Sequence, residues 1–306
     1  MVGSIEIAKF DYSQYIMKVT GFTFIKNALK YDYPIIEAIT SILPICDNFI
    51  VAVGESEDET LELIKSIDPS KIEIVQTKWD KSLREGGHVL AVETDKAFKA
   101  ISKYTDWAFY IQGDEVVHEK YLPTIKAGMI KYLNDPDVDG LLFNYAHFYG
   151  SYDYIGAAEN WYPHEIRIIR NNPMIYSYKD AQGFRKEDDK KLKVKPIDAY
   201  IYHYGWVKEP KAMQKKQEDF NKLWHNDEWV DQHVVKAEAF DYLDGISTLY
   251  KFEGTHPRVM LDRIERVNWK FGYDISFNKR SLKYRLKGFI ENKIGFNLSH
   301  KNYIKI

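Results

Sequence analysis

The first 112 residues alternate short apolar segments with amphipathic ones, and this alternation limits the fold more than any other feature of the sequence. The expected strands are runs rich in β-branched and aromatic residues, at 18–25, 48–53, 71–77 and 107–112. The expected helices carry apolar residues at helical spacing, at 33–46, 56–67 and 87–104. Strands that alternate with helices build βαβ units. We therefore expect an α/β fold with a mostly parallel sheet flanked by helices.

Two of the expected helices carry start signals. Pro34 stands at an early position of the helix at 33–46. Ser56 precedes the acidic first turn of the helix at 56–67, so we expect it to be the N-cap of that helix.

The second half of the chain has a different pattern. Longer strands are expected at 139–150, 165–172 and 198–206, with a charged, solvated turn at 186–195. From Glu209 onward the sequence reads as mostly helical. We therefore divide the chain into a ligand-binding α/β domain, 1–208, and a C-terminal helical region, 209–306.

The composition excludes several classes of protein. A net charge of −2 gives no overall bias toward nucleic acid. The single cysteine, Cys46, cannot form an intramolecular disulfide or a cysteine metal cluster. No stretch approaches the roughly 20 apolar residues that span a bilayer, and the N-terminus lacks an apolar signal core. We expect a cytoplasmic protein.

Two adjacent acids, Asp114 and Glu115, follow the expected strand at 107–112. In parallel sheets ligands bind beyond the carboxyl ends of strands. Carboxylates there suit Mg²⁺ or Mn²⁺, with substrate phosphates completing the coordination. The alternative is that one acid caps a following helix. His203, at the end of another expected strand, is either a third metal ligand or a partly buried histidine bonded to backbone.

Two segments of unusual composition each allow two interpretations. Residues 145–162 hold seven aromatic residues, which suit either a tyrosine-rich core or a sugar-binding surface. Residues 279–306 hold eight basic residues against the single acid Glu291. They suit either a solvated helical end or peripheral contact with an anionic membrane surface, here the inner face of the membrane.

Six segments resemble, in their order and spacing, the family-2 glycosyltransferases of the GT-A fold. They are "FTFIKNA", "SILPICDNFIVAVGESEDET", "DWAFYIQGDEVVHE", "WYPHEIRIIRN", "DAQGFRK" and "IYHYGWVK", within residues 18–225. The resemblance implies transfer of a sugar from a nucleotide-diphosphate donor to a hydroxyl of a glycan or lipid-linked acceptor. It also implies Mn²⁺ or Mg²⁺ as cofactor, inversion at the anomeric carbon, and a role in surface polysaccharide or glycoconjugate synthesis.

The resemblance also implies roles for donor-side residues. Asp114 would be the main metal ligand, supported by Glu115 and completed by His203. Glu55 and Asp58 would lie near the base or ribose.

Further roles concern Gln112, the arginines and the acceptor. Gln112 would bond a ribose or a metal-bound water. Arg167 or Arg170 would pair with phosphate, or would form a structural ion pair. Asp180 is the candidate base, with Glu165 and Glu159 behind it, and the acceptor would contact Tyr149, Tyr152 and Trp161.

The sequence departs from the family pattern at three places, which keeps other functions open. Many relatives carry an acid that contacts the nucleotide where Val53 or Gly54 stands here. Gln112 stands where many relatives carry the first acid of a D-x-D motif, and Ala181-Gln182 stands where many carry His-Glu. A non-catalytic carbohydrate-binding protein on the same fold is therefore the second hypothesis. A nucleotidyltransferase is the third, although no glycine-rich phosphate loop follows the first strand.

Overall fold

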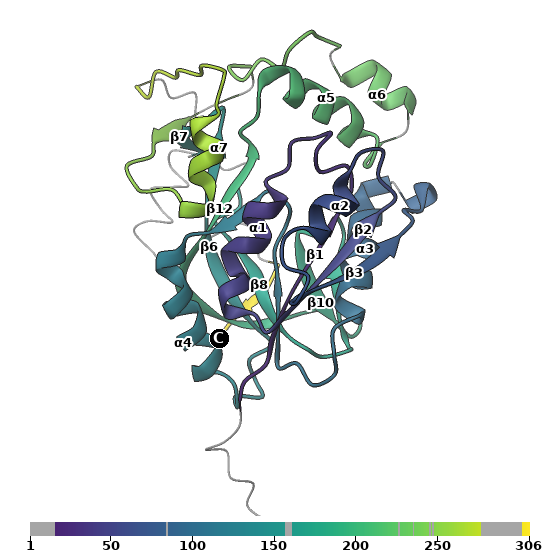
Figure 1. Cartoon of the computed structure of the whole chain (residues 1–306), viewed down its shortest axis with the longest axis vertical. Helices are drawn as coiled ribbons and strands as arrows, with labels where there is room; N and C mark the ends of the chain where they lie inside the picture. Colours follow the sequence, from purple (N-terminus) through teal and green to yellow (C-terminus); the bar gives the residue numbers. More distant parts are fainter. Residues whose placement is uncertain are drawn as a thin grey trace, which may run out of the picture.

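A single mixed β-sheet organises the molecule (Figure 1). The computed structural model describes residues 16–83, 85–156, 161–225, 227–234, 236–244, 246, 248–276 and 302–306. Within them the main sheet has eleven strands. A second sheet has three short strands, none of which pairs with a strand of the main sheet.

The N-terminal half of the sheet is parallel, as the alternation predicts. Its strands pair in the order β3-β2-β1-β4. They are β1 (Val19–Ile25), β2 (Asn48–Gly54), β3 (Ile72–Thr77) and β4 (Trp107–Tyr110). The connecting helices are α1 (Ile35–Ile42), α2 (Thr60–Lys65) and α3 (His88–Lys99). The predicted α/β class is therefore confirmed.

The predicted N-cap of α2 is wrong. The helix begins at Thr60, and Glu59 takes the cap position without a side-chain bond. Ser56 instead accepts a hydrogen bond from the Asn27 N–H at 3.0 Å and donates to the Gly54 carbonyl at 2.9 Å. Its hydroxyl thus connects the turn after β2 to the loop after β1. These bonds occupy the hydroxyl, so it does not cap the helix.

The second half of the sheet is mixed. Antiparallel β8 joins β4 to β6, and the long strand β12 runs parallel to β6 and antiparallel to the short strand β5. These strands are β5 (Glu115–Val117), β6 (Gly140–Tyr149), β7 (Ser151–Gly156), β8 (His164–Arg170) and β12 (Lys193–Trp206). The strands that follow one another through α1, α2 and α3 are therefore all parallel, whereas the rest of the sheet combines antiparallel pairs with the parallel pair β6-β12.

Alternate residues of the parallel strands fill two cores, one on each face of the sheet. One core packs against α1, α2 and α4 (Leu122–Lys131). The other packs against α3 and the small sheet. The small sheet consists of β9 (Ile175–Tyr178), β10 (Gly183–Lys186) and β11 (Lys190–Lys191).

The region after Lys208 is helical only at first. Helices α5 (Pro210–Asn221) and α6 (Asp227–His233) lie at the upper end of the molecule in Figure 1. Strand β13 (Leu249–Lys251) then joins β7, and after the short helix α7 (Leu261–Glu265) strand β14 (Ile304–Lys305) joins β12. The prediction of a mostly helical region is wrong for these strands, and the boundary after Lys208 stays a prediction.

Two predictions concern a membrane: surface contact by the basic C-terminal segment, and the lack of a spanning segment anywhere in the chain. The basic segment lies outside the described residues, except for its last five positions, 302–306. In the part of the chain that the structure describes, no helix has the length and apolarity to cross a bilayer.

Candidate functional site

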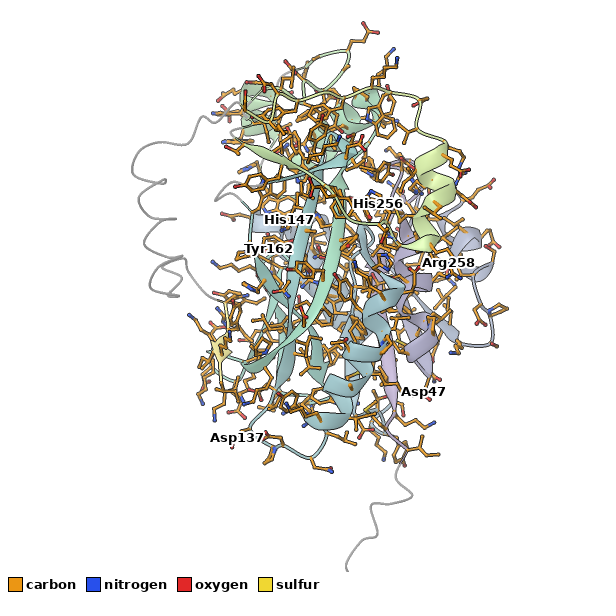
Figure 2. All side chains as sticks on the ribbon, turned by 90° about the vertical axis from the view of Figure 1, so that its left-hand side faces the viewer. Asp47, Asp137, His147, Tyr162, His256 and Arg258 are labelled. Carbon is orange, nitrogen blue, oxygen red and sulfur yellow. The ribbon has the colours of Figure 1, made fainter. Side chains whose placement is uncertain are left out.

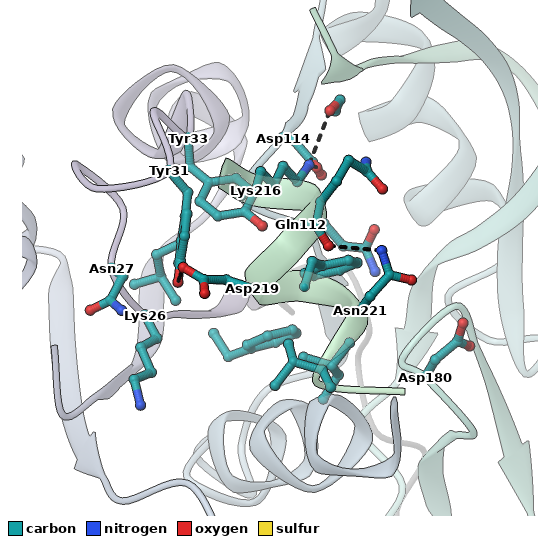
Figure 3. Close-up of a pocket in the computed structure, with 18 of the residues that line it drawn as sticks. Lys26, Asn27, Tyr31, Tyr33, Gln112, Asp114, Asp180, Lys216, Asp219 and Asn221 are labelled. Atoms are coloured by element: carbon teal, nitrogen blue, oxygen red, sulfur yellow. Dashed lines mark hydrogen bonds and ion pairs between the residues drawn. The ribbon is translucent and has the colours of Figure 1, made fainter. Parts of the chain in front are cut away.

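A cavity of about 630 Å³ opens at the carboxyl ends of β1 and β4. Three segments line most of it: the loop after β1, the turn after β4, and helix α5 with the residues that follow it. Figure 3 shows α5, in pale green, carrying Lys216, Asp219 and Asn221 into this space. The helix that the sequence assigns to a separate region therefore forms one wall of the cavity.

Two acids after β2, Asp58 and Glu57, hold the loop after β1, and of these two only Glu57 lines the cavity. Asp58 accepts a hydrogen bond from the Lys30 N–H at 2.7 Å and does not line the cavity. Glu55 is exposed and lies 3.8 Å from the Lys78 ammonium. Glu57, which the sequence analysis did not single out, lines the cavity and pairs with Lys30 at 2.7 Å.

Asp114 faces the cavity among three basic side chains. Its carboxylate is 14% exposed and lies 3.5 Å from the Lys216 ammonium and 3.8 Å from Nε2 of His203. Burial alone would raise the pKa of Asp114, but His203, Lys216 and Lys208 outweigh it and hold the pKa below its usual range. Asp114 is therefore an anion at neutral pH.

Strand pairing puts His203 in the middle of a row of three polar side chains. It lies opposite Glu115 of β5 on one side and opposite His147 of β6 on the other. Nδ1 of His203 is 3.0 Å from Nδ1 of His147. Nε2 of His147 is 2.8 Å from the Tyr162 carbonyl, and Figure 2 labels His147 and Tyr162. His147 is neutral, because burial lowers its pKa to about 3.

These contacts fix which nitrogen of His203 is free. Nε2 of His147 carries the proton that it donates to the Tyr162 carbonyl, so Nδ1 of His147 accepts. Nδ1 of His203 must then donate to it, which leaves a lone pair on Nε2, the nitrogen near Asp114. Neutral His203 thus presents the atom that binds metals, oriented by a second histidine.

Gly205 keeps that space open. A Cβ at this position would lie 2.6 Å from Nε2 of His203 and 2.7 Å from a carboxylate oxygen of Asp114. Any larger residue would therefore cover both atoms at once.

Glu115 has a different role from the predicted one. It is fully buried, and its carboxylate accepts from Nε and an Nη of Arg167 at 2.8 and 2.7 Å and from the Tyr145 hydroxyl at 2.8 Å. It also accepts from the Gln112 N–H at 3.1 Å, which fixes the turn that presents Asp114. Neither Glu115 nor Arg167 lines the cavity, so the structural ion pair is the interpretation that the structure supports.

The remaining predicted polar residues divide between the cavity and the layer behind it. Gln112 and Asp180 line the cavity. Gln112 donates to the Ala181 carbonyl at 3.1 Å, while no hydrogen bond or ion pair among the described residues engages the Asp180 carboxylate. Glu165 lies behind Gln182, which donates to it at 2.9 Å, and burial raises the pKa of Glu165 to about 7. Glu159 lies outside the described residues.

The three aromatic residues predicted to contact an acceptor do not line the cavity. Tyr149 and Tyr152 are buried in two aromatic clusters, and Trp161 packs against His147. The core interpretation of this segment therefore holds for both tyrosines. Tyr162 and Trp206 reach the cavity in their place.

The sequence analysis missed the buried lysines. Lys208 is fully buried, donates to the Asp32 carbonyl at 2.5 Å, and has its pKa lowered to about 7, mainly by burial. Lys216 donates to the Gly205 carbonyl at 3.0 Å, and both ammonium groups lie over the Tyr33 ring. Among the described residues, no group of three or more histidine, cysteine or acidic side chains could hold a metal alone.

Comparison with known proteins gives only distant likenesses. The chain is similar to S. aureus TarS, at 14% identity and a TM-score of 0.41, over 72% of this chain and 41% of that chain. It is similar to 4-diphosphocytidyl-2C-methyl-D-erythritolsynthase from Anaerococcus prevotii, at 13% identity and a TM-score of 0.37, over 63% of this chain and 92% of that one. Glucosyl-3-phosphoglycerate synthase from Mycobacterium tuberculosis, solved with Mn²⁺, UDP and phosphoglyceric acid, matches at 18% identity and 0.28, over 43% of each chain.

These likenesses do not establish a family or an activity. All three TM-scores lie below 0.5, and the chain spans about two fifths of the length of TarS. No family model and no curated protein matches the sequence. The function must therefore be argued from the site itself.

We expect Arg167→Met to destabilise the protein by about 3–5 kcal/mol, because it leaves the Glu115 charge buried without its partner. Lys65→Met is the matched control: it breaks an exposed pair with Glu62 and should cost at most about 0.5 kcal/mol. Urea unfolding followed by circular dichroism measures both. Equal costs for the two variants would contradict this role of the buried pair.

We expect Glu165→Gln to change how stability depends on pH. The folded pKa of about 7 exceeds the ordinary value of 4.5, so the folded state holds the proton more tightly than the unfolded chain does. Between these two values stability therefore falls as pH rises. Removing the charge should stabilise the protein by up to about 3 kcal/mol at pH 8 and by less than about 1 kcal/mol at pH 5. A gain that is the same at both pH values in urea unfolding would argue against a buried titrating Glu165.

Proposed function

We propose that this protein is an inverting, divalent-metal-dependent glycosyltransferase. It moves a sugar from a nucleotide-diphosphate donor to a hydroxyl of a glycan or lipid-linked acceptor, in surface polysaccharide or glycoconjugate synthesis in the cytoplasm. One observation carries the proposal: the Asp114 carboxylate and the lone pair of His203 converge in a cavity at the carboxyl edge of the parallel strands.

The residues fit a hard divalent cation. An oxygen and an imidazole ligand suit Mn²⁺ or Mg²⁺ when substrate phosphates and waters supply the remaining positions. Gly205 leaves both ligand atoms accessible. Bound there, the cation would neutralise charge that develops on the leaving diphosphate.

The charge of the cavity also favours a metal. Its described lining has three lysines and four carboxylates, a formal balance of −1 with His203 neutral. The residues are Lys26, Lys30, Lys216, Glu57, Asp114, Asp180 and Asp219. A diphosphate adds further negative charge, so a divalent cation is needed to make its binding favourable.

The cavity also suits the base and ribose of a nucleotide. Its lining includes the rings of Phe24, Trp79, Phe220 and Trp224, which offer apolar faces for a planar base. Glu57, at the rim, offers acceptors to ribose hydroxyls. A cavity of about 630 Å³ is in the usual range for a ligand of this size.

Asp180 is our candidate for the general base. The acceptor oxygen forms a bond to the anomeric carbon while the bond from that carbon to the diphosphate oxygen breaks, and its electron pair leaves with the diphosphate. The Asp180 carboxylate takes the acceptor proton. It lines the cavity without a described partner, whereas Glu165 is separated from the cavity by Gln182.

The second candidate function is non-catalytic binding of a carbohydrate on the same fold. The observation that favours it is the loss of acidic ligands: Gln112 is an amide and Glu115 is taken by Arg167, so Asp114 is the one acid of this turn that faces the cavity. Glycan binding that ignores Mn²⁺ and nucleotide would support it. Donor turnover that needs Mn²⁺ would exclude it.

We expect Asp114→Asn to lower Mn²⁺-dependent binding of the donor at least about tenfold, because one ligand oxygen and its charge are lost. Calorimetry with a panel of nucleotide-sugars, with and without Mn²⁺, measures this. Asp137→Asn is the control, because Asp137 is exposed and does not line the cavity. No binding of any donor by the unchanged protein, or full affinity in Asp114→Asn, would rule out the proposed function.

We expect Asp180→Asn to keep donor affinity and to slow transfer to the acceptor by about 10²–10⁴-fold, because only proton removal is impaired. Donor binding by calorimetry and release of the nucleoside diphosphate report the two effects separately. A variant that transfers sugar at the original rate would remove Asp180 as the base.

A further inference from the structure

In the structure the Asp114 carboxylate already has a cationic partner. The ammonium of Lys216 lies 3.5 Å from it and donates to the Gly205 carbonyl at 3.0 Å (Figure 3). Lys216 is 7% exposed and lines the cavity. It belongs to α5, which forms a wall of the cavity outside the sheet. A divalent cation at Asp114 and His203 would therefore meet a positive charge beside its main ligand.

The Lys216 ammonium and a divalent cation compete for the Asp114 carboxylate. Two positive centres a few ångströms apart repel each other strongly in a buried site, unless an anion lies between or beside them. A diphosphate is such an anion. The flexible four-carbon stem of lysine lets its ammonium turn to a new partner while the helix stays in place.

We propose that Lys216 is an exchangeable cation of the diphosphate site. As long as no divalent cation is bound, it neutralises Asp114. When a divalent cation takes this carboxylate, the ammonium of Lys216 passes to the diphosphate of the donor. That the anion is a diphosphate rests on the proposed function. That Lys216 and a cation compete for Asp114 rests on the observed contact between Lys216 and Asp114.

The exchange couples the metal and the nucleotide. Without nucleotide, the metal must displace the Lys216 ammonium from Asp114. The buried ammonium then has no anionic partner, so the affinity of the site for the metal is low. With a diphosphate present, that cost is removed, and each ligand strengthens binding of the other by the same factor. We expect a coupling of about tenfold or more.

The test is calorimetry of MnCl₂ binding to the full chain, alone and with UDP, GDP, CDP or ADP. Lys216→Met and Lys216→Gln both remove the charge, and the glutamine can still donate to the Gly205 carbonyl if the methionine variant folds poorly. Lys215→Met is the matched control, because Lys215 is the exposed neighbour on the same helix.

We expect the Lys216 variants to bind Mn²⁺ alone several-fold more tightly than the unchanged protein. The gain in Mn²⁺ affinity on adding the nucleoside diphosphate should be smaller by the same factor, while the direct contact between metal and diphosphate keeps the rest of the coupling. Lys215→Met should change neither. The exchange would be overturned if the Lys216 variants bound Mn²⁺ no more tightly than the unchanged protein. It would also be overturned if none of the proteins bound Mn²⁺ measurably.

The two arms separate this inference from the proposed function. If no nucleoside diphosphate binds with Mn²⁺, the proposed function fails and the diphosphate step fails with it. The Mn²⁺-only arm still decides whether Lys216 competes for Asp114.

Discussion

The candidate site depends on the buried ion pair between Glu115 and Arg167. Both side chains are fully buried, so each charge needs the other, and two hydrogen bonds join them. The same carboxylate holds the Gln112 N–H, which sets the shape of the turn after β4. Because Glu115 is fixed on the inner side of that turn, Asp114 is left facing the cavity. One acid of the pair thus positions the other.

Strand β12 extends this arrangement. It places His203 between Glu115 and His147, so a chain of contacts from the Tyr162 carbonyl through two imidazoles ends at the nitrogen beside Asp114. Helix α5 then adds Lys216 from the opposite wall. The site is therefore assembled from the turn after β4 and from the consecutive elements β12 and α5, which lie far from that turn in the sequence.

Much of this could be predicted from the sequence, because it follows from local pattern. Apolar periodicity located the parallel strands, and the apolar run before Asp114 placed that acid at a strand end. What could not be predicted depends on distant partners. Which of Asp114 and Glu115 faces the cavity is decided by Arg167, 52 residues away. Of the lysines on α5, only contact with Tyr33 and Asp114 distinguishes Lys216 from its neighbour Lys215.

The central claim is that Asp114 and His203 together form a cation site for a nucleoside diphosphate. A crystal structure of the protein soaked with MnCl₂ and a nucleoside diphosphate, with data collected near the manganese absorption edge, tests it most directly. The account predicts one anomalous peak within bonding distance of an Asp114 oxygen and Nε2 of His203, with the diphosphate against it. A nucleotide bound elsewhere, or an anomalous peak that touches neither residue, would contradict it.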